Sequence, residues 1–165
     1  MSADSIKRRR PAAILLVLVR HGEAGTASRD EIRELTREGR RTIRMLSAEL
    51  QSRTFSPVVI RTSPLKRAHQ TAETIFSALP EPGPVLPTNA LASGTTVDNL
   101  LGLLGAEKPG TSALWVGHMP DLGQFAARLL DEPGGVGFRP GTAVALRVIP
   151  GPEPAGSLAW TWNPD

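Results

Sequence analysis

The chain has 165 residues, of which 40% are hydrophobic and 21% charged, as expected for one soluble globular domain with a substantial core. It has no cysteine, which excludes disulfides, thiolate metal sites and a cysteine nucleophile and fits a cytoplasmic protein. The formal net charge is +3, and residues 1–10 alone contribute that much, so we predict a basic, disordered tail at 1–11 and a single domain at 12–165.

The first predicted elements are a strand, a loop and a helix. Residues 12–19 are apolar without alternation, which is typical of a strand buried on both faces of a parallel sheet. They end in Arg-His with no cleavage site, which favours a core strand over an export signal. Residues 24–35 are polar and predict a loop. Thr36 is the expected N-cap of a helix that runs to about residue 52. Its buried face is predicted to contain Ile43, Leu46 and Leu50.

A second strand and helix follow. The strand is predicted over 57–63, and the pair Ser63-Pro64 predicts a helix start with serine as N-cap and proline at the first helical position. The proline-rich segment 79–87 ends this helix. Its apolar face is predicted to comprise Leu65, Ala68, Ala72, Ile75, Phe76 and Leu79.

The second half of the chain predicts a helix, a buried strand, a helix and two strands, over residues 95–104, 113–118, 120–131, 142–149 and 157–163. Thr95 or Thr96 would cap the first of these helices. Leu158, Trp160 and Trp162 are predicted to share one face of the last strand. This order of elements predicts a three-layer α/β/α sandwich with a mainly parallel central sheet.

Three of the predicted strands end on groups suited to an anion. Arg20 and His21 follow the first strand, and residues 61–63 close the second. His118 follows the third. Ligands bind beyond the carboxyl ends of parallel strands, so we expect these groups to share one crevice with Arg67, one turn into the next helix.

The predicted crevice suits phosphate chemistry, because it would surround one imidazole with two guanidinium groups and a second imidazole. Arginine binds phosphate oxygens in pairs, a neutral imidazole can attack phosphorus, and a second imidazole can donate to the oxygens as their charge shifts. Such a site needs no metal or other cofactor. His21, His118 and Glu23 could be metal ligands in principle, but their spacing is unsuitable and the arginines would repel a cation. His69 is assigned to the surface.

Three sequence blocks, "LVRHGEA", "SPLKRAHQTAE" and "LWVGHMPDLG", resemble in order the signature blocks of the histidine phosphatase superfamily. They cover the chain from about residue 14 to 130, and the terminal "WTWNP" resembles the closing strand of small SixA-type phosphohistidine phosphatases. The resemblance implies a phosphoglycerate mutase-like fold with His21 as the nucleophile. Arg20, Arg67 and His118 would then complete the phosphate pocket.

The resemblance extends to further residues. Gly22 would let the backbone approach the phosphate closely. Ser63 would be an extra donor in the pocket, unless it only caps the helix, and Glu23 could pair with a pocket arginine. Many family members place a carboxylate that acts as the general acid after the second block. Residues 89–92, at this place in the chain, contain no carboxylate. Asp98 and Glu23 are the nearest carboxylates, and neither is favoured as the acid.

The short segment between the second and third blocks cannot build a large lid, and an open site suits a phosphate displayed on a protein. An imidazole leaves with little acid assistance, so the missing acid favours phosphohistidine as the substrate. We therefore predict a phosphatase acting on a signalling or phosphotransfer protein such as a histidine phosphotransfer domain. The alternatives are a phosphatase of nucleotide or sugar phosphates and a non-catalytic phosphate-binding module. No membrane contact is expected. Nucleic-acid binding by the basic tail is a weaker hypothesis than phosphate chemistry at the site. Nothing in the sequence indicates the oligomeric state.

Overall fold

The computed structural model describes residues 11–165, so the predicted basic tail lies outside the described residues except for its last position. Six strands form one sheet in the order β3-β2-β4-β1-β5-β6. The strands are β1 (Ile14–Arg20), β2 (Val59–Thr62), β3 (Val85–Pro87), β4 (Ser112–Gly117), β5 (Ala143–Ile149) and β6 (Ala155–Trp162). Strands β1 to β4 are mutually parallel, whereas β5 and β6 are added as antiparallel strands. The mainly parallel sheet is confirmed.

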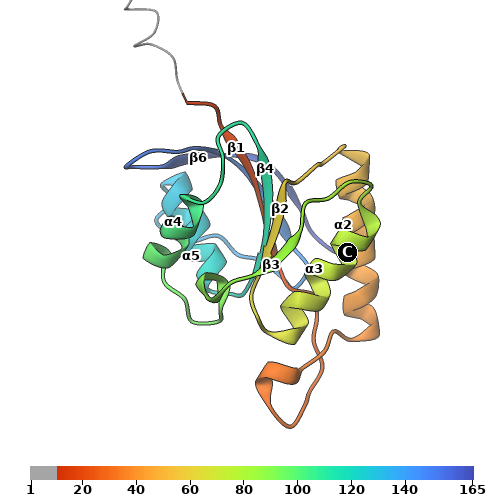
Figure 1. Ribbon diagram of the computed structural model, residues 1–165. Coiled ribbons are helices and arrows are strands. Elements are labelled where there is room, and N and C mark those ends of the chain that lie inside the picture. The colour runs from red at the N-terminus through yellow and green to blue at the C-terminus, as the bar shows by residue number, and fades with distance from the viewer. Residues whose placement is uncertain (1–10) are drawn as a thin grey trace, which may run out of the picture.

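Helices cover both faces of this sheet, as Figure 1 shows. Helices α2 (Arg37–Ser52) and α3 (Lys66–Ala78) lie on one face, and α4 (Val97–Leu104) and α5 (Asp121–Leu130) on the other. Side chains of β1 alternate between the two cores, with Leu16 and Leu18 on one side and Val17 and Val19 on the other. Both faces are buried, which explains why β1 shows no polar alternation. Among the described helices, none is long and apolar enough to cross a membrane.

The structure adds one strand that the sequence did not predict. Residues 85–87 lie in the proline-rich segment after α3, yet they form β3 and pair in parallel with β2. The strand lies at the edge of the sheet, where one side of its backbone has no partner strand. Proline is tolerated there because its missing N–H removes no hydrogen bond from the interior of the sheet. Pro87 can therefore sit at the end of β3.

Two predicted helix caps are confirmed, and one is wrong. The hydroxyl of Thr36 accepts from the Gly39 amide at 2.9 Å, and Thr96 caps α4 by accepting from Asn99 at 3.1 Å. Helix α3 instead begins at Lys66, after Ser63 and Pro64. Ser63 does not cap it because the N-cap position is Leu65, two residues later, and the Ser63 hydroxyl accepts from the Leu65 amide instead of from an amide of the helix.

Two apolar positions are more exposed than predicted. Phe76 of α3 is 37% exposed, because the neighbouring Ile75 fills the core position. Leu158 is 54% exposed, because a bulge shifts the pairing of β6 and breaks its alternation. Ala159, rather than Leu158, packs with Trp160 and Trp162 against the core beneath α2 and α3. The prediction that Leu158 shares a face with Trp160 and Trp162 is therefore wrong for Leu158.

Candidate active site

The two histidines of the predicted site follow neighbouring parallel strands. β1 and β4 pair in register so that Arg20 lies opposite Gly117, and the His21 amide donates to the Gly117 carbonyl at 3.1 Å. His21 and His118 therefore lie next to each other, just beyond the carboxyl ends of β1 and β4. The centres of their rings are 5.1 Å apart, and the ring planes are inclined by 57°. The sheet register thus brings together two side chains that are distant in the sequence.

His21 is 8% exposed, and its Nδ1 lies 2.7 Å from the carbonyl oxygen of Gly22. A carbonyl oxygen can only accept, so Nδ1 carries the proton and Nε2 keeps its lone pair. The pKa of His21 is lowered to about 4, mainly by burial and also by the charges of Arg67 and Arg20, against the raising effect of the Gly22 hydrogen bond. The ring is therefore neutral at pH 7, the state in which an imidazole is a nucleophile.

His118 is 3% exposed, and its Nε2 lies 2.7 Å from the hydroxyl oxygen of Ser63. The Leu65 amide donates to the same hydroxyl oxygen at 3.2 Å, and we assign the hydroxyl proton to the bond with His118 Nε2. In this arrangement Nδ1 of His118 carries the ring proton and is a donor. The pKa of His118 is lowered to about 4, mainly by burial and also by His21 and Arg67. Ser63 therefore orients His118.

Each of the two arginines keeps a buried Nε–H without a partner. Arg67 donates from its two terminal nitrogens to the backbone and the carboxylate of Asp30, at 3.0 and 3.3 Å, and Arg20 donates to the Phe138 carbonyl at 2.9 Å. Among the buried side-chain polar atoms of residues 11–165, only the Nε atoms of Arg20 and Arg67 lack a partner. An unpaired buried N–H is costly, and an anion would satisfy both.

Gly22 lies in a tightly packed part of the loop after β1. Its amide already donates to the hydroxyl of Thr71 at 3.1 Å. A Cβ atom at this position would lie 3.0–3.2 Å from Ile43, Leu35 and the Gly39 carbonyl. The lack of a side chain therefore lets the loop after β1 pack against α2, and the approach of its backbone to a phosphate stays a prediction.

The carboxylates considered as acids lie elsewhere. Glu23 is exposed and accepts from the hydroxyl of Thr36 at 2.8 Å, instead of pairing with a pocket arginine as predicted. Asp98 is exposed in the first turn of α4. Residues 89–91 form a 3₁₀ turn, η2, whose Leu91 is buried in the core. Within residues 11–165, no three His, Asp or Glu side chains gather as they would to hold a metal ion.

Sequence reasoning missed Asp30 and Thr71. Thr71 lies four residues after Arg67 on α3, a spacing that places both on one helix face and could have indicated their proximity. Asp30 lies in a polar loop among other charged residues, and no local pattern distinguishes it from Glu31. Only the tertiary structure shows that it contacts Arg67.

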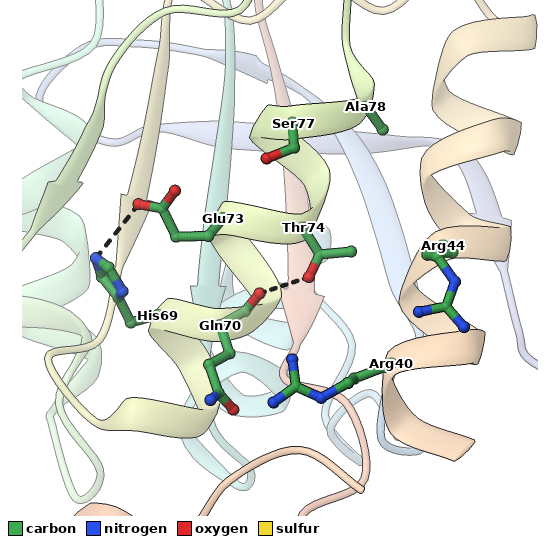
Figure 2. A pocket seen from close by; sticks show the side chains of 8 residues that line it. All are labelled: Arg40, Arg44, His69, Gln70, Glu73, Thr74, Ser77 and Ala78. Atoms are coloured by element: carbon green, nitrogen blue, oxygen red, sulfur yellow. Dashed lines mark hydrogen bonds and ion pairs between the residues drawn. The ribbon is translucent and has the colours of Figure 1, made fainter. Parts of the chain in front are cut away.

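A separate cavity of about 460 Å³ lies between α2 and α3 (Figure 2). Its lining residues are Arg40, Arg44, His69, Gln70, Glu73, Thr74, Ser77 and Ala78. Nε2 of His69 lies 3.5 Å from Glu73 in an exposed ion pair, drawn as a dashed line in Figure 2. The structure therefore places His69 at the surface and outside the histidine pair.

Comparison with known proteins identifies the class. Residues 16–92 match the sequence profile of the histidine phosphatase superfamily, branch 1. An uncharacterized protein of Picosynechococcus sp. is 32% identical over 142 residues, which cover 78% of this chain and 86% of that protein. The chain belongs to the histidine phosphatase superfamily.

Solved structures share the fold. The protein histidine phosphatase SixA complexed with tungstate superimposes with a TM-score of 0.83 at 24% identity, covering 91% of this chain and 97% of that one. The putative phosphohistidine phosphatase SixA of Nakamurella multipartitia gives 0.81 at 24% identity, covering 94% and 99%. A mycobacterial glucosyl-3-phosphoglycerate phosphatase gives 0.71 at 17% identity, covering 93% and 100%. The predicted phosphoglycerate mutase-like architecture is confirmed.

Proposed function

We propose that this enzyme removes phosphate from phosphohistidine on a protein by way of a phosphorylated His21. The observation that carries the proposal is the pair of buried, unpartnered Nε–H groups of Arg20 and Arg67 beside a neutral imidazole. These donors suit the oxygens of a phosphoryl group, and the lone pair of His21 Nε2 suits its phosphorus.

The reaction has two displacements. In the first, the lone pair of His21 Nε2 attacks phosphorus, the N–P bond of the substrate breaks, and the leaving imidazole keeps the bonding pair and a proton taken from solvent. In the second, water attacks the phosphorus of phospho-His21, loses a proton to solvent, and releases inorganic phosphate and neutral His21. Arg20, Arg67 and the Nδ1–H of His118 stabilise the equatorial oxygens in both steps.

Two features favour a phosphohistidine protein over a metabolite. Residues 89–92 provide no carboxylate to protonate a leaving alkoxide, and an imidazole needs less acid assistance. The chain between α3 and β4 forms only β3, η2 and α4, too little to enclose a small substrate. SixA, which shares this fold, is named a protein histidine phosphatase. A phosphotransfer protein as substrate would place the enzyme in the cytoplasm.

A second candidate is hydrolysis of a small phosphate ester. The shared fold with a glucosyl-3-phosphoglycerate phosphatase supports it, because the same scaffold serves a sugar-acid phosphate there. A non-catalytic phosphate-binding module is a third candidate. Trapping an acid-labile phosphate on His21 would exclude this module.

The deciding experiment uses a histidine phosphotransfer domain labelled with radioactive phosphate. We expect the wild-type enzyme to release the label in EDTA and His21→Ala to release it at least about a thousandfold more slowly, because the nucleophile is lost. His69→Ala is the matched control and should equal the wild type, since His69 lies at the surface. Equal release by His21→Ala and the wild type would refute the proposal. High kcat/KM on one phosphate ester, with no release from the protein, would favour the second candidate.

A further inference from the structure

Asp30 lies where the buried phosphate-binding donors meet solvent. It begins the 3₁₀ turn η1 (Asp30–Ile32) in the loop between β1 and α2, which projects from the sheet edge at the carboxyl end of β1 (Figure 1). Its carboxylate lies 3.3 Å from Nη2 of Arg67 and 3.1 Å from Nη1 of Arg33. The Arg67 side chain is only 6% exposed, whereas that of Asp30 is 61% exposed. Asp30 therefore carries a carboxylate at the mouth of the site.

This carboxylate is ionised at neutral pH. The hydrogen bond from Arg33 holds the pKa of Asp30 below its ordinary value, and the charge of Arg67 lowers it further. Its negative charge also acts beyond Arg67, because it raises the pKa of His118 against the lowering effect of burial. Asp30 is thus a fixed negative charge within electrostatic range of the histidines.

The contacts of Arg67 show how a substrate can bind beside this charge. Both terminal nitrogens of Arg67 donate to Asp30, and its buried Nε–H has no partner. A phosphoryl group can take this donor without displacing Asp30. Because the attacking His21 is buried and displacement is in line, the leaving group lies on the opposite side of the phosphorus, toward solvent, where the Asp30 side chain is 61% exposed.

We propose that Asp30 is a specificity-determining residue that selects against substrates whose leaving group carries a negative charge. The inference rests on the proposed phosphatase site and deepens it. An imidazole that departs with the bonding pair and one proton is neutral, so Asp30 does not repel it. The carboxylate of a phosphorylated sugar acid is repelled. At roughly 8 Å and an effective dielectric constant of about 40, this repulsion corresponds to about a fivefold difference in rate.

The test compares two aryl phosphates of similar shape. 4-Carboxyphenyl phosphate has an anionic leaving group, and 4-carbamoylphenyl phosphate has a neutral one. We expect Asp30→Asn to raise the ratio of their kcat/KM values, anionic over neutral, by about fivefold relative to the wild type. The gain should shrink as ionic strength increases. Glu31→Gln is the matched control: it removes an equal charge from the same turn, but its carboxylate contacts Arg29, so the ratio should not change.

The same comparison is made without turnover. His21→Ala cannot be phosphorylated, so calorimetry with this variant, with and without Asp30→Asn, gives the two dissociation constants directly. An unchanged ratio in both assays would overturn the role of Asp30 while leaving the proposed function intact. An equal loss on both compounds would show that Asp30 only positions Arg67 and would also overturn the inference. Wild-type enzyme inactive on both aryl phosphates and on phosphohistidine would instead overturn the proposed function.

Discussion

The ring centres of His21 and His118 lie 5.1 Å apart, with the ring planes inclined by 57°. Each ring has a hydrogen bond at one of its two nitrogens. Nδ1 of His21 is bound to the Gly22 carbonyl, and Nε2 of His118 is bound to the Ser63 hydroxyl. These bonds leave a lone pair on one ring and an N–H on the other. In the proposed mechanism, these hydrogen bonds make His21 the nucleophile and His118 the donor.

His118→Ala should lower kcat by about 10²- to 10³-fold, because the transition state loses a donor to its equatorial oxygens. The measurement is steady-state release of phosphate at pH 7 from the phosphorylated protein substrate. Phospho-His21 should still form, only more slowly, because the nucleophile is intact. A kcat within threefold of the wild type would contradict the role of His118 as a donor.

Ser63→Ala should lower kcat by about tenfold and leave KM nearly unchanged, because His118 loses the hydroxyl that orients it. The buried ring nitrogen also loses its partner, so the free energy of unfolding should fall by about 1–3 kcal/mol. Kinetics and urea unfolding test the two effects. Ser77→Ala, on the exposed face of α3, is the control and should change neither quantity. A stability loss with no change in kcat would mean that Ser63 serves only the fold.

Acid should destabilise the enzyme through its buried histidines. Burial lowers the pKa of folded His21 to about 4, from an ordinary value of 6.5. Above pH 6.5 the ring is neutral in both states. Between pH 6.5 and 4 the unfolded chain binds a proton that the folded chain does not, so the free energy of unfolding falls by about 3 kcal/mol. The pKa of His118 is lowered alike and adds to the fall.

Urea unfolding at pH 7, 5.5 and 4 measures this dependence. His21→Asn should flatten it, whereas His69→Asn should leave it as steep as in the wild type. The value of kcat/KM should be retained down to about pH 5 and then fall as His21 becomes protonated. A free energy of unfolding that is constant from pH 7 to 4 would show that the histidines are not buried in the neutral form.

Gly39→Ala should destabilise the protein by about 1–3 kcal/mol and reduce activity. A Cβ atom at this position would collide with the Glu23 carbonyl oxygen, so α2 would have to move away from the loop that carries His21. Gly102→Ala in α4 is the matched control, because a Cβ there meets nothing within 4 Å. It should stabilise the protein by about 0.5–1 kcal/mol. Thermal unfolding of both variants checks the contrast, and similar melting temperatures would refute it.

Predictions from local pattern hold where local interactions decide the structure. The apolar run of β1, the caps at Thr36 and Thr96, and the order of strands and helices all follow from periodicity and capping. The exposure of Leu158 does not follow from periodicity, because the bulge depends on how β6 pairs with β5. The edge strand β3 does not follow from the local sequence either. A segment with prolines can form a strand only at the edge of a sheet, and the order of all the strands decides where that edge lies.

For the site, the sequence by itself determined that Arg20, His21 and His118 follow strand ends, because a parallel sheet collects such residues at one edge. Only the tertiary structure decided how each is held. It turned Ser63 from a helix cap into the partner of His118, and it brought Asp30 from an unremarkable polar loop onto Arg67. Periodicity specifies which face of an element is buried, whereas these contacts join distant segments whose relative positions are set by the packing of the whole chain.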